Sequence, residues 1–431
     1  MIEPEPLQQL DRTYVRFRKR KLSYFSGCDY FRLASHPRVI RALEAGVRKY
    51  GLNVASSRLT TGNHVLYRQL EARLAEFFKA ETALLVSTGY LTNLVVAQAL
   101  ARNFSHALLD EKSHPSLRDA ARFLDCPVLE FRHRNPESLA SAIRRCGPAA
   151  KPIVLTDGMF SHDGSAAPLA EYLKLLPKDA FMLVDDAHGA GVLGRTGRGA
   201  FEHAGVGRRR IIQTITLSKA FGAYGGAILG SAQLRRQILD HSSLFVGSTP
   251  LPLPLANAAI EAVRILKTDK TLRARLSRNI DYVRAALNKA SCSPLGELSE
   301  ASRSFGVRQS SGAFEPMVVP AKAPEDWRTP KGRRDRLSRR GALAHLRGRR
   351  AEEAILEPPS SLSTRGPIIP ILLNRPRDLL KLKRALLAAG IYPPFIQYPT
   401  GPATGYFRFV VSSEHTRSQL DQLIEVLLAQ A

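Results

Sequence analysis

The chain has 431 residues, and its 63 Lys and Arg residues outnumber 38 Asp and Glu, giving a formal net charge of +25 at pH 7. This length suffices for one large domain and a smaller one, and no apolar run approaches the roughly 18 residues of a membrane span. The N-terminus lacks the order of a secretory signal, and the four cysteines are far apart without metal-type CxxC spacing. We therefore expect a reduced, cytoplasmic protein without a metal site, and neither a membrane protein nor a disulfide scaffold.

The first residues, 1–50, are predicted to form a separate N-terminal segment. We expect a helix from about Leu7 to Lys21, followed by a short strand and a second helix.

Strands and helices then alternate from about 65 to 250, within a large domain predicted to span residues 51–290. Helical stretches such as Pro136–Arg145 separate the strand candidates. These candidates are Ala83–Ser87, Ala107–Leu109, Val128–Phe131, Ile153–Thr156, Phe181–Asp185, Ile211–Leu217 and Ala227–Gly230. The alternation predicts an α/β fold with a mostly parallel sheet covered on both faces. Ligands of such sheets bind beyond the carboxyl ends of the strands.

One of these strands runs directly into charged residues. The apolar run 181–184 is followed by Asp185, Asp186 and, two residues later, His188. A carboxylate buried at a strand end is costly unless a cation meets it, and a protonated pyridine nitrogen is such a cation. The alternative is an exposed Asp-Asp turn at the surface.

The next strand delivers a lysine to the same edge. The apolar residues of 211–217 lead to Lys219, with small residues after it. Such an amine can form a Schiff base with an aldehyde cofactor. A strand-end lysine can equally be an ordinary solvated residue, so the interpretation depends on its pairing with Asp185.

A strongly basic stretch interrupts the C-terminal part. Between Lys322 and Arg350 there are eleven Lys or Arg residues and three acids, without a sustained apolar period. We interpret 322–366 as a solvated basic insertion. Its charge could attract nucleic acid or an acidic carrier protein. However, it has no aromatic residue after Trp327 for stacking and no known binding module, so we do not expect specific nucleic-acid binding.

The remainder of 291–431 is predicted to be a small α/β domain. Strand-like segments occur at Ile368–Leu373 and Tyr406–Val411, and helix-like segments at Arg377–Ala389 and from Thr416 onward.

Five segments together resemble the α-oxoamine synthase family of pyridoxal-phosphate enzymes. In chain order they are Ser87–Asn93, Ser113–Ser116, Asp157–Gly164, Asp185–Gly189 and Thr216–Gly222. The resemblance covers roughly residues 20–315 and 367–431. It implies a fold-type-I pyridoxal-phosphate transferase, like aspartate aminotransferase, with a homodimer whose subunits share active sites.

The resemblance also implies a role for each matching residue. Lys219 would carry the cofactor as a Schiff base and remove the substrate Cα proton, and Asp185 would pair with the pyridine nitrogen. His114 would stack on the ring and contact substrate, while His188 and Ser161 would lie near the phenolic oxygen. The residues expected at the phosphate are Gly89, Tyr90, Thr216 and Thr249, the last from the neighbouring subunit.

On the substrate side, Arg408 matches the family arginine that binds the amino-acid carboxylate, and Thr400 matches a substrate-contacting threonine. The implied reaction joins a small L-amino acid to an acyl thioester, of coenzyme A or an acyl-carrier protein. Loss of carbon dioxide then gives an α-amino ketone.

Within the family, Ser57–Asn63 and Gly197–His203 most resemble the 8-amino-7-oxononanoate synthases of biotin biosynthesis. Three features depart from the family pattern. Cys28 stands where an asparagine is usual, 53–56 replaces a glycine-rich run, and Tyr67 replaces a histidine. These departures leave the identity of both substrates open.

Three alternatives remain at this point. The chain could be another enzyme on the same cofactor, such as an aminotransferase, a glycine C-acetyltransferase or a retro-aldol lyase. It could be a non-catalytic scaffold subunit, against which Lys219 and Asp185 argue. It could also be a basic binding protein on an enzyme fold.

Overall fold

The computed structural model describes residues 5–291, 366–373, 375–397 and 404–430. These residues belong to a single unit by their contacts, formed by 1–292 and 354–431. The predicted basic insertion, except for its last residue, falls outside the described residues. The domain boundaries expected at residues 50 and 290 stay predictions. No helix within the described ranges is long and apolar enough to cross a membrane.

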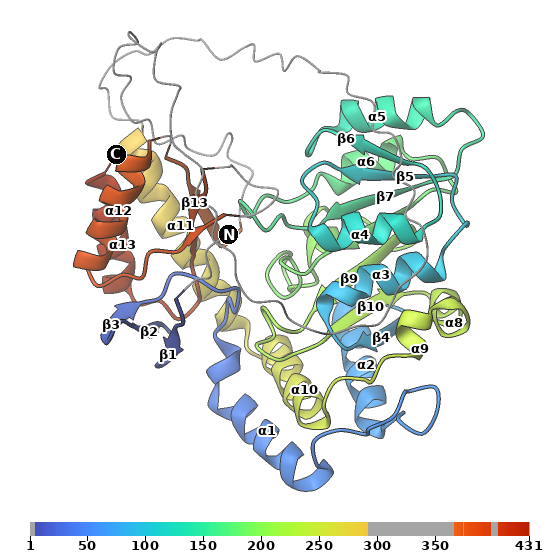
Figure 1. The fold of residues 1–431 in the computed structure, drawn as a ribbon, viewed down its shortest axis with the longest axis horizontal. Coiled ribbons are helices and arrows are strands. Elements are labelled where there is room, and N and C mark those ends of the chain that lie inside the picture. The colour runs from blue at the N-terminus through green and yellow to red at the C-terminus, as the bar shows by residue number, and fades with distance from the viewer. Residues whose placement is uncertain (1–4, 292–365, 374, 398–403, 431) are drawn as a thin grey trace, which may run out of the picture. The chain divides into compact units, whose positions relative to one another are not determined.

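A seven-stranded, mostly parallel sheet organises the larger part of the described chain, as predicted (Figure 1). In spatial order its strands are β4 (Thr82–Val86), β10 (Gly226–Gly230), β9 (Ile211–Thr216), β8 (Phe181–Asp185), β7 (Pro152–Asp157), β5 (His106–Asp110) and β6 (Val128–Phe131). Only β10 is antiparallel to its neighbours, β4 and β9. Every predicted strand of this region is present, with bounds shifted by at most one residue.

Apart from the edge strand β6, which is partly exposed, the strands of this sheet are buried at nearly every position, and most of their residues are apolar. Successive side chains of a strand point to opposite faces. Accordingly, Val154 and Met182 belong to one hydrophobic cluster, while Ile153 and Leu183 belong to a second. The second cluster is covered by three helices, α3 (Gly89–Ala99), α4 (Pro115–Phe123) and α8 (Ala232–His241).

Helices against the first cluster come from a wider range of the chain. They include α1 (Pro37–Tyr50), α2 (Val65–Phe78), α5 (Pro136–Arg145), α6 (Leu169–Leu175), α10 (Leu253–Thr268) and α11 (Lys270–Ser291). Two short helices, α7 (Ala200–His203) and α9 (Ser243–Val246), complete this region.

The predicted helix at 7–21 is wrong. This segment forms three antiparallel strands, β1 (Gln8–Gln9), β2 (Tyr14–Phe17) and β3 (Arg20–Ser23). In β2, Val15 is buried and Arg16 is exposed, which is the two-residue period of a strand rather than a helix. Arg18 and Lys19 both have positive φ, as a two-residue hairpin turn requires.

The C-terminal residues form a second, three-stranded antiparallel sheet, and the sequence predicts two of its strands, at 368–373 and 406–411. Its order is β11 (Ile368–Ile371), β13 (Tyr406–Val410) and β12 (Phe395–Ile396). Two helices accompany it, α12 (Pro376–Ala388) and α13 (Arg417–Leu428). Thr416 caps α13 in a reciprocal capping box with Gln419, which explains why the helix begins there.

Parallel strands bring their carboxyl ends to one edge of the large sheet. There β5 ends at Asp110, β7 at Asp157, β8 at Asp185 and β9 at Thr216. Three carboxylates and a hydroxyl are thus placed side by side, where ligands of this architecture bind.

Candidate active site

A cavity of about 160 Å³ opens at this edge of the sheet. It lies among the ends of β7, β8 and β9 and the beginnings of α3 and α4. Its lining residues are Gly89, Tyr90, His114, Ser116, Asp157, Asp185, Ala187, His188, Thr216 and Lys219. Seven of the predicted site residues therefore lie together.

Asp185 is a buried carboxylate in a cage of hydrogen-bond donors. One oxygen accepts from the Asn93 side-chain amide at 2.7 Å and from the Ser116 hydroxyl at 3.2 Å, and the other from the Ala187 backbone N–H at 3.0 Å. Asn93 is held in turn by the Thr214 hydroxyl at 2.6 Å. Within the described ranges Asp185 has no ion-pair partner, so a fixed carboxylate faces the cavity without a cation.

Lys219 and His188 meet in the same cavity. The lysine Nζ lies 2.7 Å from Nε2 of His188, whose Nδ1 lies 2.7 Å from the Tyr30 hydroxyl. Burial lowers the pKa of Lys219 from its ordinary 10.5, because the protonated amine is poorly solvated there. Burial, aided by the charge of Lys219, holds the pKa of His188 well below 6.5, so its ring is neutral.

His114 caps α4, and its ring accepts from the Ser116 backbone N–H at 3.2 Å. Its own backbone N–H donates to Asp157 at 2.8 Å. Burial lowers the pKa of His114 and raises the pKa of Asp157 well above its usual range, with the charge of Asp185 adding to the second shift. Both shifts favour the uncharged form of the group.

The beginning of α3 leaves room for an anion. The first backbone N–H groups of a helix have no partner within it, and the helix dipole favours negative charge there. Gly89, the first residue of α3, lies against Thr216, and a Cβ at position 89 would come within 2.6 Å of the Thr216 Cβ. A glycine is thus required for α3 to begin this close to β9.

Arg408, on β13, lies beside the cavity without lining it. Its Nε donates to the Ser161 carbonyl at 2.6 Å, and an Nη donates to the Cys28 sulfur at 3.5 Å. Arg408 thus joins the C-terminal sheet to the loop after β7.

Cys28 is expected to react with iodoacetamide at a lower pH than Cys126 or Cys146. Burial acts to raise the pKa of Cys28, but the positive charges of Arg408 and Lys219 outweigh it and leave that pKa below the ordinary 9.0. Burial raises the pKa of both other thiols. Because the thiolate is the reactive form, a pH series of labelling rates, measured peptide by peptide, separates the three. The same pH dependence at all three cysteines would contradict this electrostatic account.

The remaining predicted residues lie elsewhere. Ser161 contacts Arg408 through its carbonyl oxygen rather than lining the cavity, Thr249 is exposed, and Thr400 is outside the described residues. Sequence reasoning assigned no role to Asn93 or Tyr30, which position Asp185 and His188. Asn93 belongs to one of the family-like motifs, which is the signal that could have revealed it.

Two of the departures from the family pattern lie outside the cavity. Ala55 is exposed and has a φ of 47°, a left-handed conformation that glycine adopts more easily. Ala55 is not among the residues that line the cavity. Tyr67 is fully buried, and its hydroxyl donates to the Leu251 carbonyl at 2.8 Å, so its place here is structural.

Asp186, next to the site, is enclosed by backbone. It accepts from the Ala200 N–H at 2.9 Å and from the Gln213 side chain at 2.6 Å. A Cβ at Gly189 or Gly199 would fall within 2.0 or 1.7 Å of its carboxylate oxygens. Burial raises the pKa of Asp186 to about 7.

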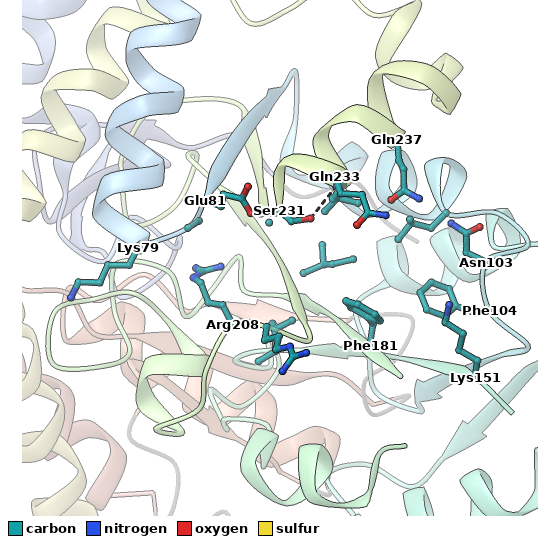
Figure 2. Close-up of a pocket in the computed structure, with 17 residues that line it drawn as sticks. Lys79, Glu81, Asn103, Phe104, Lys151, Phe181, Arg208, Ser231, Gln233 and Gln237 are labelled. Atoms are coloured by element: carbon teal, nitrogen blue, oxygen red, sulfur yellow. Dashed lines mark hydrogen bonds between the residues drawn. The ribbon is translucent and has the colours of Figure 1, made fainter. Parts of the chain in front are cut away.

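Figure 2 shows a larger cavity, of about 460 Å³, at the opposite edge of the sheet. Its lining includes Phe181 and Ile211, which begin β8 and β9, and Ser231, which caps α8. Lys151 lies 5.8 Å from the Phe104 ring on one side of it. None of the predicted site residues lines this cavity, so volume alone does not identify the active site.

Comparison with known proteins agrees with this geometry. Residues 25–427 match the family model for aminotransferase class I and II. The chain is 32% identical over 411 residues to 8-amino-7-oxononanoate synthase of Thioalkalivibrio sulfidiphilus, covering 95% of this chain and 88% of the relative. It is 31% identical to the enzyme of that name from Methylococcus capsulatus, covering 94% and 87%.

Solved structures show the same fold. Serine palmitoyltransferase of Sphingomonas wittichii superposes with a TM-score of 0.78 at 24% identity, over 98% of this chain and 90% of that one. An 8-amino-7-oxononanoate synthase from Francisella tularensis gives 0.68 at 22% identity, over 95% and 97%.

Proposed function

The chain belongs to the class I and II aminotransferase family as an acyltransferase of the α-oxoamine synthase type, and from this premise we propose that it joins a small L-amino acid to an acyl thioester. The proposed reaction releases carbon dioxide and a free thiol and yields an α-amino ketone. The observation that carries the proposal is the convergence of Lys219, Asp185 and His188 in one cavity, with Arg408 beside it.

The cofactor of this family is pyridoxal phosphate, and the residues present fit it. The unpaired carboxylate of Asp185 suits a protonated ring nitrogen, and the beginning of α3 at Gly89 and Tyr90 suits a phosphate. Thr216 would add a hydroxyl, and His114 would lie against the ring. When bound, pyridoxal phosphate supplies an aldehyde that takes up an amine and a ring that withdraws electrons from the amino acid's Cα.

Lys219 has the character of a proton carrier at Nζ. Its lowered pKa makes the neutral amine available closer to neutral pH, and neutral His188 at 2.7 Å can exchange a proton with it. We propose that Lys219 removes the Cα proton of the amino acid. His188 and Ser161 are proposed to lie near the phenolic oxygen of the cofactor.

Arg408 is proposed to bind the carboxylate of the amino acid. Its guanidinium is held by the Ser161 carbonyl and Cys28, which leaves its planar fork preorganised for a bidentate pair. Cys28, in the position that the family usually gives to asparagine, would then lie close to the bound carboxylate. Thr400 stays a proposed substrate contact.

Arg408→Lys is expected to raise KM for the amino acid about 10- to 100-fold, as loss of a charge-assisted hydrogen bond predicts, with a smaller change in kcat. The lysine keeps the charge but loses the fork. Steady-state kinetics with varied amino acid measures both constants. Arg384→Lys, an exposed residue of α12, is the matched control. A fall in kcat with unchanged KM would place the substrate carboxylate elsewhere.

The two substrates are proposed from chemistry as well as resemblance. Alanine, glycine or serine is the proposed amino acid, since the cavity of about 160 Å³ must also hold part of the cofactor. A thioester of coenzyme A or of an acyl-carrier protein is anionic, and the net charge of +25 would draw either one by long-range attraction that salt screens.

A homodimer is part of the proposal. Thr249 is exposed and lies outside the lining of the cavity in its own chain. That position fits a residue that reaches the phosphate site of a neighbouring subunit. Light scattering after gel filtration would give the assembly, and a monomer that retains full activity would remove Thr249 from the site.

The proposed reaction is tested by supplying each small amino acid with thioesters of increasing chain length. Free thiol and carbon dioxide are followed together, and equal release of both supports decarboxylative condensation. Amino transfer to a keto acid without thiol release would assign the chain to the aminotransferases instead. Thiol release that occurs with glycine and acetyl-CoA, and with no other pair of substrates, would indicate glycine C-acetyltransferase chemistry.

A further inference from the structure

Two histidines and an aspartate form a cluster separate from the cavity lining. His133 follows β6, while His162 and Asp163 lie in the loop between β7 and α6. One ligand-type atom from each lies within 4.8 Å of the other two, and all three residues are half-buried. The search for closely spaced cysteines in the sequence could not reveal this cluster, because it contains no cysteine.

A hydrogen bond with Asp110 fixes the orientation of the His133 ring. Asp110, which is fully buried at the end of β5, lies 2.9 Å from Nδ1 of the His133 ring. Its two oxygens also accept the backbone N–H groups of Lys112 and Arg134 at 2.9 and 3.0 Å. Because a carboxylate oxygen only accepts, Nδ1 carries the proton and Nε2 presents its lone pair.

This Nε2 lone pair is unsatisfied. The atom is buried and has no hydrogen-bond partner among the residues that the structure describes. A buried polar atom without a partner is destabilising. A carboxylate that holds one ring nitrogen while the other faces outward is the arrangement that orients a histidine toward a metal ion.

The other two side chains present matching donors. The His162 ring lies 5.2 Å from the His133 ring, centroid to centroid. One oxygen of Asp163 accepts from the N–H and hydroxyl of Ser165 at 2.9 and 2.8 Å. The second oxygen lies 3.6 Å from Nε2 of His162, too far for a hydrogen bond but a normal spacing for two ligands of one ion.

We propose that His133, His162 and Asp163 bind one divalent transition-metal ion of the Zn²⁺ class, with a remaining position for water. Two imidazoles and a carboxylate are a ligand set that zinc accepts, at distances of about 2.0–2.2 Å. Donors bound to one ion therefore lie at most about 4.4 Å apart. The three donor atoms lie within 4.8 Å of one another, which is close to this bound, and rotation of the half-buried His162 side chain can bring them onto one ion.

A bound ion would also fix the loop that contacts Arg408. Ser161, whose carbonyl accepts from Arg408 at 2.6 Å, directly precedes His162. The ion would thereby position Arg408 for the amino-acid carboxylate. This consequence rests on the proposed function, so ion binding is measured first, without substrates.

The experiment adds Zn²⁺ to the metal-free, tag-free holoenzyme and measures bound metal after gel filtration. Co²⁺ in place of Zn²⁺ gives an absorption spectrum that reports its ligands. We expect one ion per chain, and His162→Gln or Asp163→Asn should each weaken binding at least about tenfold. His241→Gln, an exposed histidine of α8, is the control and should bind as the wild type does.

Circular dichroism confirms that each variant is folded, and the two single variants remove different ligands, so a folding defect in one leaves the other as a test. Wild type that binds no ion overturns the proposal, as does unchanged affinity in both variants. A variant that loses ion binding but keeps the wild-type KM for the amino acid would leave the metal site standing. It would refute only the proposed effect of the ion on Arg408.

Discussion

Lys219→Ala is expected to lower turnover by about 10⁴-fold or more, since a positioned general base alone contributes about 10²–10⁴ and the covalent attachment is lost with it. Its side chain is the amine that lies beside His188, in the same cavity as the carboxylate of Asp185. Cofactor binding should be weakened but retained, because Asp185 and the beginning of α3 remain in place.

The measurement is borohydride reduction followed by peptide mapping. Wild type should carry a pyridoxyl label on Lys219, and Lys219→Ala should carry none while still copurifying with some cofactor. Lys174→Ala removes an exposed lysine of α6 and should be labelled as wild type is. Wild type labelled on a different lysine would refute the assignment of Lys219.

Asp185→Asn is expected to slow removal of the Cα proton by about 10²–10³-fold, the usual loss when a preorganised electrostatic partner is removed. The asparagine has one acceptor oxygen, so it can keep the hydrogen bond from Asn93 or the one from Ala187, but not both. What disappears is the negative charge that stabilises a protonated cofactor ring.

Exchange of the alanine Cα proton for deuterium, followed by NMR, measures this step without any thioester. Asp157→Asn provides a contrast from the neighbouring strand end. Burial raises the pKa of Asp157 well above its usual range, which favours the uncharged carboxyl, so an asparagine there should cost less. Equal losses in the two variants, or near-normal exchange in Asp185→Asn, would show that Asp185 is not the partner of the ring.

The large sheet could be predicted from the sequence because most of its strands are buried on both faces and are mainly apolar. The N-terminal hairpin could not, because β2 has four residues among charged neighbours and depends on pairing with β1 and β3. Four residues of alternating burial are too short a pattern to predict a strand, when the charged residues around them are compatible with a helix.

A similar division holds for the site. Lys219, Asp185 and His188 follow strands, so their meeting at one edge follows from parallel topology. Asn93 reaches Asp185 across 92 residues, and Tyr30 reaches His188 across 158. Such contacts depend on how helices and loops pack over the sheet, which no local pattern encodes.

The enclosure of Asp186 limits which mutations this chain can accept. Gly189 and Gly199 are not proposed to contact cofactor or substrate, yet an alanine at either would overlap the Asp186 carboxylate. By contrast, nothing lies within 4 Å of a Cβ at Gly207, which lacks the left-handed conformation as well. Substitution is therefore disfavoured at two positions outside the chemistry, whereas Gly207, eight residues after Gly199, has room for a side chain.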